Sequence, residues 1–303
     1  MKVASFYRFL DLDQAESFRD ELLSCCQELE LLGTVLVAAE GINGTLAGNG
    51  DSIRGLFRWI EKRLALAQPI EARWTEAQTA PFRRLRVRLK KEIVTLGRPD
   101  IRPQRKTGTR VPPEDWNTLI ENPEVLVIDT RNQYEVEVGT FPRAMDPGTD
   151  SFREFPQFAE ALAETDRNRP LAMFCTGGIR CEKATALMLE LGFDEVYQLE
   201  GGVLNYLSTV PAAENRWDGE CFVFDTRVAV DRDLAEGGYV QCHACRRPLS
   251  AEDIESSDYR EGVSCPHCVD NLAPERRSRL EERRRQVALG EARGAPHIGP
   301  SKS

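Results

Sequence analysis

The residues best suited to chemistry are Cys175 and the five-residue loop that follows it. That loop reads Thr176, Gly177, Gly178, Ile179 and Arg180. An apolar run at residues 171–174 predicts a buried strand before it, and apolar residues at helical spacing in 181–191 predict a helix after it. The unpaired amides and dipole of that helix, with the charge of Arg180, favour a thiolate at Cys175. We therefore interpret Cys175 as an activated nucleophile rather than an inert buried cysteine.

A second candidate site is a run of cations at residues 82–91. Residues 73–110 contain 12 basic and 3 acidic side chains. Strict alternation predicts a strand that buries Leu85, Val87 and Leu89 on one face. The opposite face then presents four cations, Arg84, Arg86, Arg88 and Lys90. Like charges repel along one strand face, so an external polyanion, nucleic acid above all, is favoured over a merely solvated surface.

Two cysteine pairs near the C-terminus have the spacing of a metal site. The pairs are Cys242 with Cys245 and, after nineteen intervening residues, Cys265 with Cys268. Two such CxxC pairs are typical of a tetrahedral zinc site with four thiolate ligands, which would stabilise a segment poor in large apolar residues. His243 and His267 lie inside the pairs and are alternative ligands, and four unligated thiols are the remaining alternative.

Alternating strand and helix patterns surround Cys175. Strands are expected at 125–128, 171–174 and 195–199, and helices at 151–162 and 181–191. Such an order predicts a parallel, doubly wound α/β sheet, whose ligand crevice lies beyond the carboxyl ends of its strands. Cys175 lies at such an end.

The N-terminal region mixes strands and helices differently. Strands are expected at 3–9, 33–39 and 45–47, and helices at 12–32 and 52–66, which predicts a ferredoxin-like α+β sandwich. Asn43 followed by Gly44 predicts the turn of a hairpin, because both residues tolerate positive φ. Whether the turn from Glu40 to Gly44 also has a function stays open.

Composition shifts divide the chain, because a stretch rich in Pro, Arg, Thr and Gly follows residue 97 and the cysteine pairs follow residue 217. The expected parts are an N-terminal ferredoxin-like domain (1–97), a linker (98–112), a catalytic α/β domain (113–216), a zinc-binding segment (217–273) and a charged helical or disordered tail (274–303).

The overall charge and cysteine content narrow the class of protein. The 303 residues have a net charge of −9, divided into +5 for residues 1–110 and −14 for the remainder. No signal peptide or bilayer-spanning apolar segment is evident, and nine cysteines of this spacing suit a reducing compartment. A cytoplasmic protein without membrane partners is expected.

The Cys175 loop resembles the active loop of rhodanese sulfurtransferases, in which four residues separate Cys and Arg. Asp129 and Arg131 resemble the signature with which that domain opens. Phosphatases on a similar scaffold have one more residue in the loop, which encloses a phosphate. The resemblance therefore implies a rhodanese-like fold and sulfur chemistry.

Nearly the whole chain resembles the oxygen-dependent tRNA uridine hydroxylase family. The resemblance rests on the turn at 40–44, on Asp129 and Arg131, on residues 175–183 and on the two cysteine pairs, the second of which ends at Cys268. It implies hydroxylation of the wobble uridine (position 34) at carbon 5, giving 5-hydroxyuridine, with molecular oxygen as co-substrate. The implied reactive residue is Cys175, and the implied partner is the anticodon region of tRNA.

The chemical route is left open by the sequence. No flavin or nucleotide fingerprint and no iron-binding triad can be read, so the electron donor is unknown. A thiolate attack on carbon 6 of uracil and a cysteine persulfide that reacts with oxygen are both conceivable. The alternatives in other classes are a rhodanese-type sulfurtransferase that passes persulfide sulfur to a small thiol, and a zinc-bearing RNA-binding adaptor.

Overall fold

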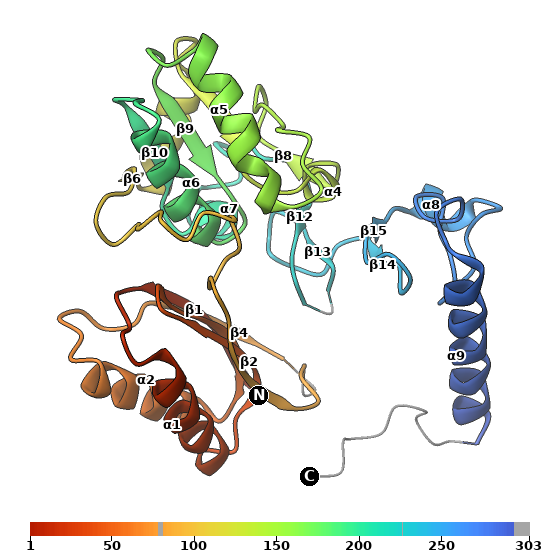
Figure 1. Ribbon diagram of the computed structural model, residues 1–303. Coiled ribbons are helices and arrows are strands. Elements are labelled where there is room, and N and C mark those ends of the chain that lie inside the picture. The colour runs from red at the N-terminus through yellow and green to blue at the C-terminus, as the bar shows by residue number, and fades with distance from the viewer. Residues whose placement is uncertain (78–80, 226, 294–303) are drawn as a thin grey trace.

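The computed structural model describes residues 1–77, 81–225 and 227–293. Its N-terminal part is a five-stranded sheet with two helices on one face (Figure 1). The strand order is β4-β1-β3-β2-β5, antiparallel except for the parallel pair β2 and β5. The elements are β1 (Lys2–Phe9), α1 (Ala15–Glu28), β2 (Leu32–Ala38), β3 (Gly41–Gly48), α2 (Gly50–Arg63), β4 (Ala72–Glu76) and β5 (Leu85–Leu89). This is the predicted ferredoxin-like sandwich.

The apolar core of this domain lies between the sheet and the two helices. It includes Phe6, Val35 and Leu46 from the strands and Phe18 and Ile53 from the helices. Alternate residues of every strand therefore point to the other face of the sheet, which no helix in the described part of this domain covers.

Three local expectations in this domain were wrong. The hairpin turn lies at residues 39–40, and Asn43 and Gly44 are inside β3. Gly44 is needed for close packing, because a Cβ there would lie 3.0 Å from the Thr34 carbonyl oxygen. Helix α1 is shorter than 12–32, since its last turn closes at Leu29 and the next residue, Glu30, has a φ of 53°. Leu89 is 44% exposed rather than buried, because it ends edge strand β5 outside the core to which Val87 belongs.

The central domain has the predicted parallel sheet, in the order β6-β10-β9-β7. Helices α5 and α6 pack on one face, through Leu171 and Met173 of β9, and α3 and α7 pack on the other, through Ala172 and Phe174. The elements are β6 (Thr109–Val111), α3 (Pro113–Glu121), β7 (Leu126–Asp129), α4 (Gln133–Val136), β8 (Gly139–Thr140), a 3-10 turn (Phe152–Glu154), α5 (Phe155–Thr165), β9 (Leu171–Phe174), α6 (Ile179–Glu190), β10 (Val196–Leu199) and α7 (Gly202–Thr209).

The structure adjusts the expected borders of this domain. Strand β6 lies inside segment 98–112, so the end of the expected linker belongs to the sheet. Trp217 and Cys221, expected in the zinc-binding segment, pack into the core of the central domain. The helix expected at 151–162 is divided into the 3-10 turn and α5.

The C-terminal part consists of short hairpins and one long helix. Its elements are β11 (Asp218–Gly219), β12 (Cys221–Phe222), β13 (Ala229–Val230), β14 (Val240–Gln241), β15 (Pro248–Leu249), α8 (Ala251–Glu255) and α9 (Pro274–Ala292). Among the described residues, no helix has the length and apolar character required to cross a bilayer.

Candidate active site and metal centre

Cys175 directly follows β9 and is fully buried at the N-terminal end of α6. Gly178 allows the loop to turn back on the sulfur: its φ is +92°, and its backbone N–H donates to Cys175 Sγ at 3.1 Å. Burial alone would raise the pKa of Cys175, but a hydrogen bond from the Cys181 thiol, the charge of Arg180 and backbone amides lower it to about 6. These contacts support the expected thiolate.

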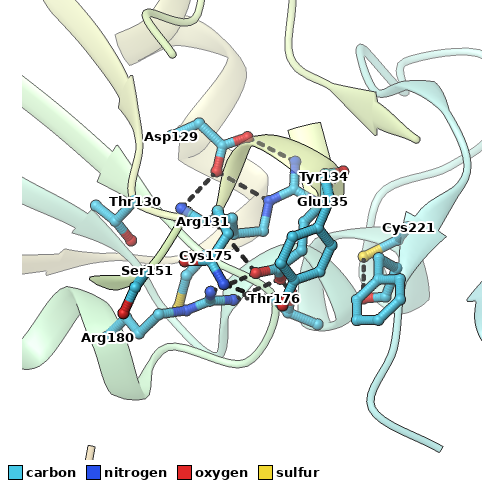
Figure 2. A network of polar contacts seen from close by, with 12 residues as sticks. Asp129, Thr130, Arg131, Tyr134, Glu135, Ser151, Cys175, Thr176, Arg180 and Cys221 are labelled. Atoms are coloured by element: carbon cyan, nitrogen blue, oxygen red, sulfur yellow. Dashed lines mark hydrogen bonds and ion pairs between the residues drawn. The ribbon is translucent and has the colours of Figure 1, made fainter. Parts of the chain in front are cut away.

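Arg180 is held by a partner that the sequence analysis did not single out. Its guanidinium donates two hydrogen bonds to Glu135, at 2.6 and 2.7 Å, in the bidentate arrangement shown in Figure 2. Glu135 is fully buried, and burial would raise its pKa, but Arg180 lowers it. The available signal was the Asn132 and Glu135 capping box that begins α4. Arg180 thus acts on Cys175 through its charge, in an orientation fixed by Glu135.

Asp129 and Arg131 form a buried ion pair in a layer behind the loop. Arg131 donates to both carboxylate oxygens of Asp129, at 2.9 and 2.5 Å, and its guanidinium lies 4.9 Å from the ring centroid of Trp217. Arg131 also donates to the Glu135 carbonyl oxygen at 3.3 Å. The pair therefore connects the end of β7 to the residue that holds Arg180 (Figure 2).

Cys181, in the first turn of α6, lies buried beside Cys175. Burial and the hydrogen bond to Cys175 raise its pKa well above the usual value. Its sulfur lies 3.6 Å from Thr130 Oγ1. At neutral pH the arrangement is thus one thiolate, Cys175, that accepts from one protonated thiol, Cys181.

The open face of the N-terminal sheet lies against the active loop. Tyr7 of β1 comes so close that a Cβ on Gly178 would lie 2.9 Å from the Tyr7 hydroxyl. Burial and the neighbouring carboxylate of Glu182 raise the pKa of Tyr7. Arg110 donates to the same Glu182 carboxylate at 2.6 Å. The candidate active site therefore contains residues from two domains, which the sequence could not show.

A buried ionic cluster fastens these two domains together. Lys183 of α6 donates to Glu40 at 2.8 Å and to Glu92 at 2.5 Å, and all three side chains are at most 5% exposed. Glu40 also accepts from the Ile93 amide at 2.7 Å. The turn at residues 39–40 thus has a structural role, since its Glu40 holds the helix of the active loop against the N-terminal domain.

Two family models match the chain. The UPF0176 acylphosphatase like domain matches residues 1–93, and the rhodanese-like domain matches residues 112–209. A relative from Teredinibacter turnerae, named tRNA uridine(34) hydroxylase, is 49% identical over 297 residues, which are 98% of this chain and 92% of the relative. The chain belongs to the tRNA uridine(34) hydroxylase family. The predicted resemblance is confirmed, together with the rhodanese-like and ferredoxin-like folds.

Solved structures align with single domains of this family member. A rhodanese-like domain from Anabaena, determined by solution NMR, is 16% identical, with 37% of this chain and 80% of that chain covered and a TM-score of 0.31. An acylphosphatase from Coxiella burnetii is 20% identical, with 29% of this chain and 90% of that chain covered and a TM-score of 0.22.

The predicted basic face of this family member is formed by β5 and its flanks. Arg84, Arg88 and Lys90 are exposed and Arg86 is half-buried. Because Leu85 and Val87 belong to the core on the helix side, Arg86 and Arg88 lie on the open face of the sheet. This is the same face that carries Tyr7 to the active loop.

The four cysteines of the predicted metal site lie together. Their sulfurs are all within 4.8 Å of one another, with 3.7 Å between Cys245 and Cys265 and 3.6 Å between Cys265 and Cys268. A tetrahedral site with zinc–sulfur bonds of about 2.3 Å requires sulfur separations of about 3.8 Å, so the cluster fits such an ion. His267 instead lies 3.2 Å from Asp253, and neither His267 nor His243 joins the cluster.

Proposed function

We propose that this protein hydroxylates carbon 5 of the wobble uridine of tRNA, giving 5-hydroxyuridine, with molecular oxygen as co-substrate. The observation that carries the proposal is a buried thiolate, Cys175, set where a basic sheet face meets the active loop. A relative that is 49% identical over nearly the full length bears the name of a hydroxylase with this substrate position. The proposal places the enzyme among oxidoreductases of the monooxygenase type.

In this proposal the loop residues have distinct roles. Cys175 is the nucleophile, and the backbone amides of Gly178, Arg180 and Cys181 stabilise negative charge on the sulfur or on a sulfur attached to it. Arg180 adds positive charge, and its ion pair with Glu135 keeps it in place. Thr176, Gly177 and Ile179 shape the cradle.

The stoichiometry requires a further partner. Insertion of one oxygen atom of O₂ at carbon 5 leaves the other atom to be reduced to water, which takes two electrons and two protons. The proposal therefore includes an external electron donor. The choice between attack on carbon 6 and oxygenation of a cysteine persulfide depends on that donor's chemistry.

The open face of the N-terminal sheet is our proposed path for the RNA. The strand register places Arg86 beside Thr34, Thr34 beside Thr45, Thr45 beside Ser5 and Ser5 beside Arg73. This row contains no acidic residue and crosses all five strands, a distance of roughly 19 Å at the usual strand spacing. Ser5 is exposed, and Thr34 and Thr45 are partly exposed. RNA phosphates would thus bind Arg84, Arg86, Arg88 and Lys90, and a polar surface would lead from these residues to the catalytic domain.

We assign the remaining parts supporting roles. The segment 217–273 would hold one structural Zn²⁺ through Cys242, Cys245, Cys265 and Cys268, which ties its two hairpins together. The proposed division otherwise keeps a substrate-binding domain at 1–97 and a charged tail at 274–303. The catalytic domain (113–216) also includes β6 from the end of the linker (98–112), and Trp217 and Cys221 pack into its core. We place the enzyme in the cytoplasm, together with its tRNA substrate.

The direct test is mass spectrometry of wobble nucleosides in tRNA from cells that lack the gene. Complementation with the wild-type gene restores 5-hydroxyuridine and complementation with Cys175→Ser does not, because the serine hydroxyl ionises far too weakly to replace the thiolate. Growth under ¹⁸O₂ labels the new hydroxyl group. Normal 5-hydroxyuridine in the Cys175→Ser strain would refute the proposal, and thiosulfate sulfurtransfer without any tRNA product would favour the sulfurtransferase alternative.

The proposed RNA path has its own test. Combined Arg86→Glu and Arg88→Glu should weaken tRNA binding and flatten its dependence on salt, because fewer counterions are released when fewer phosphates are neutralised. The pKa of Cys175 should not change, since β2 and β3 separate β5 from β1, the strand whose Tyr7 lies at the loop. A wild-type salt slope in the double variant would show that tRNA docks elsewhere.

A further inference from the structure

Phe224 is an exposed aromatic side chain whose exposure does not contribute to the packing of the fold. It is 68% exposed, at the turn between β12 and β13. The turn is closed by a hydrogen bond from the Val223 amide to the Val228 carbonyl oxygen at 2.8 Å. Phe222 packs edge-on against Phe224 with ring centroids 5.1 Å apart, and Tyr134 packs against Phe222 at 5.4 Å. Phe224 is therefore a solvent-facing ring that packs on the buried ring of Phe222.

This ring lies next to the active loop. The guanidinium carbon of Arg180 is 5.8 Å from the Phe224 ring centroid, while Arg180 itself is only 7% exposed. Arg180 is also the residue whose charge favours the Cys175 thiolate. Phe224 therefore covers the outer side of the active loop and leaves most of its own surface to solvent.

Arg73 of β4 approaches the same loop from the N-terminal domain. Its Nη2 donates to the Gly201 carbonyl oxygen at 3.3 Å, and it forms no salt bridge with any residue in the described ranges. The turn at Gly201 backs the active loop, because the Val203 amide donates to the Cys175 carbonyl oxygen at 2.9 Å. A half-buried guanidinium without a carboxylate partner, beside a catalytic loop, is suited to an anionic ligand.

We infer that Phe224 and Arg73 bind the target nucleotide, with the uracil base stacked on the Phe224 ring and an adjacent RNA phosphate held by Arg73. The inference deepens the proposed function and rests on it. A base in an anticodon loop must leave its neighbours before a buried thiol can reach it, and an exposed ring beside the thiol replaces the lost stacking. Arg73 ends the row of polar residues that begins at Arg86, so one RNA strand contacts both.

Binding of an anticodon stem-loop RNA with uridine at the wobble position tests the base contact. Phe224→Ala should weaken binding about 5- to 150-fold, the range typical of one base stacked on an aromatic ring, and Phe224→Tyr should keep the affinity. Phe224→Leu should behave like Phe224→Ala, because leucine is apolar but has no ring face. With a stem-loop that is abasic at the wobble position, all four proteins should bind alike.

The phosphate contact has a different signature. Arg73→Gln should weaken binding of both RNAs equally and reduce the slope of log affinity against log salt by about one. Trp74→Ala and Arg58→Gln are matched controls, because Trp74 packs against Phe57 on the helix side of the sheet and Arg58 lies on α2. Neither control should alter binding. Titration of the Cys175 thiol should be unchanged in every variant, which separates a binding role from disturbance of the loop.

Several results would overturn the inference. These are wild-type affinity in Phe224→Ala, full rescue by Phe224→Leu, an equal loss on the abasic RNA, or an unchanged salt slope in Arg73→Gln. A shifted Cys175 titration in Phe224→Ala would show that the ring only supports the loop. If the wild-type protein neither binds nor hydroxylates the uridine stem-loop, the proposed function itself fails, and that result differs from all the others.

Discussion

Replacement of Arg180 by glutamine removes a buried positive charge that stabilises the Cys175 thiolate. The pKa of Cys175 is lowered from 9.0 to about 6 against the effect of burial, and Arg180 shares that lowering with the Cys181 thiol and backbone amides. An opposite charge close to an ionisable group is worth about one to three pKa units, so we expect a Cys175 pKa of about 7 or higher in Arg180→Gln.

The size of the effect depends on the pH of the assay. With a pKa of about 6 the thiolate fraction is about 90% at pH 7 and about 9% at pH 5, and a rise of about one unit changes these to about 50% and 1%. The thiolate fraction of Arg180→Gln is thus lower than that of the wild type by less than twofold at neutral pH and by about tenfold at pH 5. Because Cys175 is buried, thiolate ultraviolet absorbance is a better readout than alkylation, with the matching Cys175→Ser protein subtracted in each background.

Two controls make this test decisive. Glu135→Gln removes the neighbouring negative charge but keeps an amide oxygen that accepts a hydrogen bond from Arg180, so it should lower the Cys175 pKa or leave it in place. Arg180→Gln also leaves Glu135 buried without a cation, which costs about 3–5 kcal/mol, so thermal unfolding must confirm that the protein is folded during the titration. A folded Arg180→Gln protein with the wild-type titration curve would refute the assigned role of Arg180.

Three further predictions concern the neighbours of the loop and the metal centre. Cys181→Ala should raise the Cys175 pKa because a hydrogen-bond donor is lost, whereas Cys181→Ser keeps a donor and should shift it less; equal titration of both variants and the wild type would contradict this. Lys183→Met should reduce the free energy of unfolding by about 3–5 kcal/mol because it leaves Glu40 and Glu92 buried without a cation, and Glu40→Gln should cost less, as thermal denaturation of the pair will show. Elemental analysis should find one zinc per chain, and Cys265→Ala should lose the metal and expose the C-terminal hairpins to proteolysis while the Cys175 titration is unchanged; metal-free wild-type protein purified under reducing conditions would argue against the site.

The sequence by itself determined the features that depend on neighbours along the chain. The strand, loop and helix around Cys175 follow from an apolar run, a pair of glycines and helical spacing within twenty residues. The four-cysteine cluster follows in the same way, because metal-ligand spacing is a local property of each CxxC pair. Alternation also assigned Arg86 and Val87 to opposite faces of one strand.

Only the tertiary structure decided which distant residues meet. Glu40 was predicted only as part of a turn, yet its carboxylate binds Lys183 in another domain. Asn43 and Gly44 are strand residues, because neighbouring strands require close packing there. Leu89 follows the alternation but is exposed, since burial depends on which helix covers a strand rather than on the strand's own pattern. The Cys175 loop is surrounded by residues from three parts of the chain, namely Glu135, Tyr7, Arg73 and Phe224. Their spacing in the sequence does not predict that they meet there. Contacts between residues far apart in sequence are set by how sheets and helices pack, and local patterns do not contain that information.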